Sequence, residues 1–150
     1  MKKLVLIIMV AFATYNMASG QVFYFELGGP GIASFNLDTR FSSGPGGLGA
    51  RIGIGGYSVD GSGQVYLPLG VNYLIGEDTK HFFEVGAGVT PVFGDDFDDG
   101  IFTQTFGHIL FGYRLQPADG GFSFRGFLSP IFSSGYFIPY YGGVSFGYKF

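Results

Sequence analysis

His108 is the residue of this chain that could take part most directly in catalysis. An imidazole can take the proton of a serine hydroxyl and so create a nucleophile, provided that a further polar group orients the ring. The sequence contains no motif that sets a serine and an acid at a defined spacing from His108. We therefore predict that His108 is a hydrogen-bonded histidine of the protein interior and that the chain is not an enzyme.

A cluster of four aspartates is the second candidate site. It consists of Asp95, Asp96, Asp98 and Asp99. Closely spaced carboxylates can bind Ca²⁺, but this segment lacks the spaced ligands of an EF-hand loop. A solvated acidic loop is the simpler interpretation, and whether the loop 95–99 binds a cation stays open. The glycine runs at 28–31 and 43–47 are turns rather than phosphate loops, because no helix follows them. We predict no metal and no cofactor.

Ten polar residues recur within segments in which apolar and polar side chains alternate. They are Glu26, Asp38, Arg40, Arg51, Asn72, Glu84, His108, Arg114, Arg125 and Lys149. A β-strand points successive side chains to opposite faces, so Glu84 lies opposite the face that carries Phe83 and Val85. We predict that the ten residues form a polar network inside a closed sheet and pair with one another, because unpaired buried charge is costly.

Eight such segments are separated by turn signals. Their ranges are 22–28, 32–41, 48–57, 64–75, 81–93, 101–115, 121–132 and 140–150. They predict one all-β domain, an eight-stranded antiparallel up-and-down transmembrane β-barrel with a packed polar lumen. Side chains fill the interior of a barrel of about eight strands, so we do not expect a general diffusion pore.

Three prolines lie inside the predicted strands, Pro68, Pro91 and Pro130. Each removes one hydrogen bond from the ladder of its strand. We expect β-bulges at these positions, and the strand register around them stays open.

The composition favours lipid as the environment of the apolar face. The chain has 28 Gly, 19 Phe, 10 Tyr and no Trp, and only 13% of its residues are charged. After the first twenty residues, no apolar run reaches the roughly 18 residues of a membrane helix. A domain of this size has limited core volume for so many aromatic side chains. Only helices and closed barrels cross a bilayer with their backbone groups satisfied.

The N-terminus has the pattern of an export signal. Lys2 and Lys3 precede an apolar run from Leu4 to Ala13 and a small-residue cleavage site at 18–20. We predict a signal peptide at 1–20 and a β-barrel domain at 21–150. Without Lys2 and Lys3 of the signal peptide, the mature chain has 6 basic and 11 acidic residues. Its net charge of −5 does not suit nucleic-acid binding. No cysteine is present, so the fold holds without disulfides.

The last residues carry the most specific pattern. Val144, Phe146, Tyr148 and Phe150 occupy alternate positions up to the C-terminus. With this strand, the chain resembles the small outer-membrane β-barrel domain proteins of Gram-negative bacteria, over roughly all of residues 21–150. The segment 26–32 also resembles the start of such barrels. The resemblance implies that the four C-terminal residues form an assembly signal that the barrel-assembly machinery recognises.

The resemblance also implies an integral protein of the bacterial outer membrane, a monomer in contact with lipid and lipopolysaccharide. We expect a non-enzymatic protein with a structural or surface-interaction role. Two alternatives stay open: a lipid-modifying barrel enzyme, and a soluble secreted lipocalin-like ligand binder.

Two groups of aromatic and apolar residues are candidates for interfacial girdles. One is Phe132, Tyr136, Phe137, Ile138, Tyr140 and Tyr141, which could instead form an adhesive tip; the other is Tyr73, Tyr113 and Tyr148.

Overall fold

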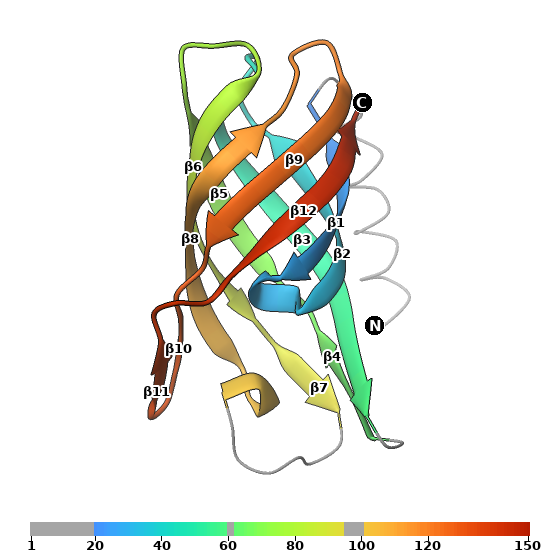
Figure 1. The fold of residues 1–150 in the computed structure, drawn as a ribbon, viewed down its shortest axis with the longest axis vertical. Coiled ribbons are helices and arrows are strands. Elements are labelled where there is room, and N and C mark those ends of the chain that lie inside the picture. Colours follow the sequence, from blue (N-terminus) through green and yellow to red (C-terminus); the bar gives the residue numbers. More distant parts are fainter. Residues whose placement is uncertain (1–19, 60–61, 95–100) are drawn as a thin grey trace, which may run out of the picture.

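Antiparallel strands wind into a closed barrel in this computed structural model, which describes residues 20–59, 62–94 and 101–150 (Figure 1). The strands are β1 (Val22–Gly28), β2 (Ala33–Arg40), β3 (Gly47–Val59), β4 (Ser62–Tyr66), β5 (Leu69–Ile75), β6 (His81–Thr90), β7 (Val92–Gly94), β8 (Phe106–Leu115), β9 (Gly121–Leu128), β10 (Ile131–Ser133), β11 (Tyr136–Ile138) and β12 (Gly142–Lys149). Two short 3₁₀ turns are η1 (Gly29–Gly31) and η2 (Ile101–Thr103). The acidic loop 95–99 and the predicted signal peptide, except its last residue Gly20, lie outside the described residues.

The ring closes through the first and last strands. β1 pairs with β2 on one side and with β12 on the other, and β8 pairs with β9 to complete the circle. β4 with β5, β6 with β7, and β9 with β10 each form one barrel strand that a proline interrupts. β11 pairs with β10 outside the ring. The prediction of an all-β, eight-stranded antiparallel barrel is therefore confirmed.

Two of the three prolines interrupt their strands without shifting the register. Across Pro68, Ile52 pairs with Leu69 and Gly55 pairs with Tyr66, so both strands advance by the same number of residues. The same holds across Pro91, and across Pro130 on the side of β8. On the other side of Pro130, Leu128 pairs with Gly142 and Ile131 pairs with Ile138, so the last strand advances four residues against three. The expectation of β-bulges was wrong at Pro68 and Pro91, because a bulge adds a residue to one strand only. Opposite Pro130, the last strand has one extra residue, which is a bulge.

The proline carbonyls explain how the ladder continues. Pro68 O accepts a hydrogen bond from Gly53 N at 2.9 Å, and Pro130 O accepts one from Ile109 N at 3.0 Å. Proline has no N–H to donate, so the regular ladder is interrupted at these positions, while the proline carbonyl still accepts a hydrogen bond across the sheet.

The two ends of the barrel differ. At the end that holds the C-terminus, turns join β2 to β3, β5 to β6 and β8 to β9 (Figure 1). At the other end, the β10–β11 hairpin projects past the wall. The turn η1 closes the β1–β2 hairpin about halfway along the barrel, and its three residues are buried.

The turn at η1 depends on positive φ angles. Gly28 (φ 74) and Gly29 (φ 66) adopt values that glycine reaches without a steric penalty. Ile32 (φ 61) does so as a β-branched residue, which is unfavourable. Its backbone N–H donates to Gly29 O at 3.1 Å, and its side chain packs against a buried apolar cluster, which hold it in this conformation.

Two predicted segments differ from the structure. The range 101–115 was predicted as one strand, but β8 begins only at Phe106 because the 3₁₀ turn η2 occupies Ile101–Thr103. The connection before the last strand contains an additional strand, β11, because the apolar residues 136–138 pair back onto β10.

Candidate functional site

The ten polar residues that the sequence singles out are all buried. They are Glu26, Asp38, Arg40, Arg51, Asn72, Glu84, His108, Arg114, Arg125 and Lys149, with exposed fractions between 0 and 8%. They come from all eight barrel strands, at positions that alternate with outward-facing apolar residues. The barrel therefore collects side chains that are distant in sequence into one interior cluster.

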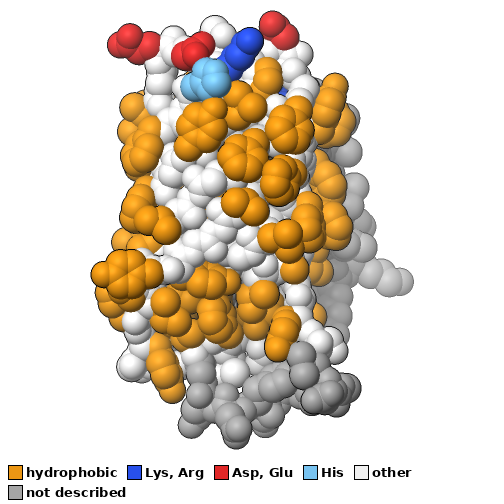
Figure 2. Space-filling model, in the orientation of Figure 1, with side chains coloured by type: hydrophobic (Ala, Val, Ile, Leu, Met, Phe, Trp, Pro, Cys, Tyr) orange, Lys and Arg blue, Asp and Glu red, His pale blue; other side chains and the backbone are white. Residues whose placement is uncertain are grey.

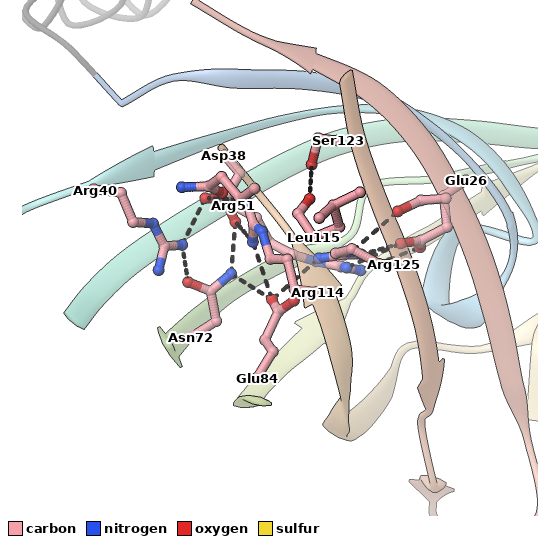
Figure 3. A network of polar contacts seen from close by, with 12 residues as sticks. Glu26, Asp38, Arg40, Arg51, Asn72, Glu84, Arg114, Leu115, Ser123 and Arg125 are labelled. Atoms are coloured by element: carbon pink, nitrogen blue, oxygen red, sulfur yellow. Dashed lines mark hydrogen bonds and ion pairs between the residues drawn. The ribbon is translucent and has the colours of Figure 1, made fainter. Parts of the chain in front are cut away.

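Seven of these residues form one unbranched chain of alternating charges (Figure 3). In order, the chain runs Arg40, Asp38, Arg114, Glu84, Arg125, Glu26, Arg51. Each of the three carboxylates lies between two arginines, and an arginine stands at each end. We call this arrangement the ion-pair chain.

Glu84 holds the centre of the ion-pair chain. The register places Arg114 of β8 directly opposite Arg125 of β9, a pairing of like charges that is unfavourable by itself. Glu84 Oε1 accepts a hydrogen bond from Nη1 of Arg114 at 3.3 Å and from Nη1 of Arg125 at 3.1 Å. The Glu84 carboxylate on β6 thus offsets the repulsion between Arg114 and Arg125.

The carboxylates on either side are each held by two guanidinium groups. Arg114 donates to both oxygens of Asp38 at 3.1 Å, in the two-pronged geometry that arginine favours. Arg51 donates to both oxygens of Glu26, at 3.2 and 3.5 Å, and Arg125 also donates to Glu26. Such pairs repay the cost of burying charge only when the remaining donors and acceptors are satisfied.

Neutral side chains satisfy part of that need. Asn72 donates to Asp38 at 2.6 Å and to Glu84 at 2.9 Å, and its carbonyl oxygen accepts a hydrogen bond from Arg40. The Arg125 guanidinium lies over the ring of Tyr24, 4.4 Å from its centroid, a favourable cation–π arrangement. The sequence pattern had not singled out Tyr24, although it alternates with the outward Phe23.

Three of the ten predicted residues are not members of the ion-pair chain: Asn72, which is hydrogen-bonded to it, Lys149 and His108. Lys149 Nζ donates to the carbonyls of Pro117 and Ala118, at 3.1 and 2.7 Å, and so joins β12 to the turn between β8 and β9. His108 Nδ1 has no hydrogen-bond partner in the described residues. That His108 is hydrogen-bonded therefore stays a prediction.

Further along the barrel, the interior is apolar rather than ionic. Tyr66, Ile101, Phe106 and Ile131 form a buried cluster, and Ile32 packs against it. Tyr66 Oη donates to the Phe102 carbonyl at 3.1 Å, which fixes η2 against β4. The prediction of a packed polar lumen therefore needs correction, because polar side chains do not fill the interior along the whole barrel.

The outer wall carries large apolar side chains on every barrel strand. Examples, one from each, are Phe23, Phe35, Ile54, Val71, Phe83, Ile109, Phe122 and Phe146. In Figure 2, hydrophobic side chains are spread over the visible wall, and the charged side chains in view lie at the end that holds the C-terminus. Soluble monomers rarely expose apolar area on this scale.

The candidate girdle residues lie at the surface or close to it. Tyr73, Tyr113 and Tyr148 are exposed, as are Phe132, Tyr136, Phe137 and Tyr140, while Ile138 and Tyr141 are half-buried. Tyr113 Oη lies 2.6 Å from Nδ1 of His81, and their rings stack.

The C-terminal residues Val144, Phe146, Tyr148 and Phe150 all point away from the interior and are exposed. The strand β12, which precedes Phe150, pairs with β9 from Gly142 to Lys149 and with β1 from Gly143 to Lys149.

The described ranges give little support to a membrane-spanning helix or to a metal site. No helix there has the length and apolar character needed to span a membrane. No group of three or more His, Asp or Glu residues there is placed to hold a metal ion. Comparisons with models of known protein families, with curated proteins and with solved structures gave no match.

Proposed function

We propose that this chain is a non-enzymatic integral protein of the bacterial outer membrane, with a structural or surface-interaction role. The observation that carries the proposal is the reversed distribution of side chains, with Arg125 1% exposed and Phe35 53% exposed. In water, this arrangement would bury charge and expose hydrocarbon at the same time, which is unfavourable on both counts. Around a lipid-exposed barrel it is the expected arrangement.

The dimensions of the strands support the same proposal. β6 has ten residues. At a rise of about 3.4 Å per residue and a tilt of about 45°, it extends about 24 Å along the barrel axis. That height matches the apolar band of about 25 Å on membrane barrels.

The filled interior argues against a diffusion pore. The ion-pair chain crosses the barrel, and η1 and the apolar cluster occupy positions further along it. A role at the surface is more consistent with these features. The projecting β10–β11 hairpin, with the exposed Phe132 and Phe137, is the surface we propose for contact with lipopolysaccharide or an external partner.

By the same proposal, export precedes insertion, and the barrel-assembly machinery recognises the strand that carries Phe146, Tyr148 and Phe150. The inserted protein is a monomer surrounded by lipid. Its closed ring leaves no unpaired edge along β1 or β12 for a second copy to extend.

Cell fractionation tests the location. We expect the protein to stay in the outer-membrane fraction after washing with urea or alkaline carbonate, and to migrate differently on gels before and after heating. Recovery as a soluble monomer from the periplasm, without detergent, would contradict the proposal and favour the soluble ligand binder.

A further inference from the structure

The barrel wall is shorter on one side than on the other. β1 pairs with β12 only as far as Gly28 opposite Gly143, and β2 pairs with β3 only as far as Ser34 opposite Gly55. Beyond this level, β3 continues to Val59 beside β4, and the chain before β12 continues in the β10–β11 hairpin. Figure 1 shows that η1 ends the β1–β2 hairpin about halfway along the barrel. We call the part of the wall that ends at η1 the short wall.

Glycines at the end of the β1–β2 hairpin set the height of the short wall. A Cβ atom at Gly55 would collide with the Gly31 carbonyl oxygen, and one at Gly143 would lie 2.6 Å from the Leu27 carbonyl oxygen. Only glycine lets the end of the hairpin approach β3 and β12 this closely. Ile32 adds an unfavourable positive φ at the same turn, a kind of strain that is concentrated at functional sites. The sequence therefore specifies this early turn.

Inward side chains beyond the short wall stay partly accessible. Tyr57 pairs with Gln64, so both lie on the inner face of the sheet, yet Gln64 is 6% exposed and Tyr57 is 50% exposed. The difference follows from position. Gln64 lies between β3 and β7, whereas in the described ranges Tyr57 has a strand, β4, on one side only. Tyr57 therefore faces the interior from an edge of the wall.

The interior beyond the short wall is apolar. Four half-buried residues pack there against the buried cluster that contains Tyr66, namely Ile32, Phe102, Ile138 and Tyr141. The ring centroids of Phe102 and Tyr141 lie 5.4 Å apart. None of these side chains is charged at neutral pH. An aromatic and aliphatic surface with a few hydroxyl groups is typical of sites for apolar ligands.

We propose that one acyl chain of a membrane lipid crosses the short wall and packs on this apolar surface, between Tyr57 and Tyr141. The inference rests on the proposed membrane location, which places lipid against the outer wall. An acyl chain begins with an ester or amide carbonyl, which can accept a hydrogen bond from the edge of β3 beyond Gly55. Unpaired backbone groups are costly in hydrocarbon, so a chain with a polar linkage suits this edge better than an alkane does.

Photolabelling in lipid vesicles tests the inference. A phospholipid with a diazirine on one acyl chain forms a carbene on illumination, the carbene inserts into residues that it touches, and peptide mass spectrometry locates the adducts. We expect adducts on the inward Tyr57 and Tyr141 as well as on the outward Phe35 and Val71. Adducts on the two outward residues alone would overturn this inference and leave the membrane proposal intact. A lack of adducts on all four would overturn both.

A matched pair of variants extends the test. Tyr141→Arg places a charge on the apolar surface, and Tyr140→Arg places it on the preceding residue, whose side chain is 91% exposed. We expect labelling of Tyr57 to fall by about tenfold in Tyr141→Arg, because an unpaired charge is costly among apolar side chains. In Tyr140→Arg it should stay close to that of the wild type, with labelling of Phe35 unchanged in both. If Tyr141→Arg does not fold, Tyr141→Gln takes its place. Equal labelling of Tyr57 in the two variants would contradict the site.

Discussion

Replacing Glu84 with glutamine is expected to lower the free energy of unfolding by about 3–5 kcal/mol, the usual effect of removing one partner from a buried ion pair. Glu84 is the only carboxylate in the described structure that contacts both Arg114 and Arg125, which face each other across β8 and β9. Without its charge, two adjacent guanidinium groups repel each other in a medium that screens them poorly. Urea unfolding in lipid vesicles, followed by the β-sheet circular dichroism signal, measures the loss.

Glu77→Gln is the matched control for this prediction. It makes the same chemical change in the exposed turn between β5 and β6 and is expected to alter stability by no more than about 0.5 kcal/mol. If Glu84→Gln and Glu77→Gln gave the same small loss, the ion-pair chain would not contribute to holding the barrel together.

Replacing Val71 with arginine is expected to cost about 2–4 kcal/mol, the penalty measured for arginine at the bilayer midplane on the lipid face of a barrel. Val71 lies on β5 with its side chain 54% exposed, and its neighbours across the sheet are Ala50 and Ala87. If this wall faced water, the same change would be nearly neutral, because substitutions at exposed positions rarely exceed about 0.5 kcal/mol. The same urea titration in vesicles gives the answer.

Thr79→Arg is the control for position. Thr79 is exposed in the turn between β5 and β6, outside the strands. We expect this variant to unfold like the wild type. A Val71→Arg variant as stable as Thr79→Arg would place the wall of the barrel in water.

The sequence predicted which side chains share a face, because a strand has a period of two and the period can be counted directly. Phe83 and Glu84 are adjacent in sequence and lie on opposite sides of the wall, the first exposed and the second buried. The prolines were correctly placed as interruptions of the strands. Their effect on register could not be read from one chain, because register depends on how two strands advance relative to each other.

The order of the ion-pair chain was also beyond the sequence. Asp38 and Arg51 are direct neighbours on β2 and β3, which suggests a pair, but Asp38 pairs with Arg40 and Arg114 instead. Long side chains reach across the barrel interior. The closed shape of the barrel, rather than the pairing of adjacent strands, therefore decides which charged groups form ion pairs.

The apolar half of the interior was missed for a different reason. Tyr66, Phe106 and Ile131 occupy inward positions at which the pattern is not polar. In the sequence, a segment with apolar residues on both faces looks like an irregular strand. The structure shows that these three residues and Ile101 of η2 form one buried cluster. A signal was present in the sequence, namely the weaker alternation of the range 101–115.

Depth-dependent fluorescence quenching tests most directly whether the apolar wall faces lipid. The chain has no cysteine, so Val71→Cys and Thr79→Cys each take a single fluorescent label. For the protein folded into vesicles, we predict that lipids brominated on their acyl chains quench the label at 71 and that aqueous iodide does not, with the reverse at 79. Quenching of the label at 71 by iodide, without quenching by the brominated lipids, would contradict the membrane account.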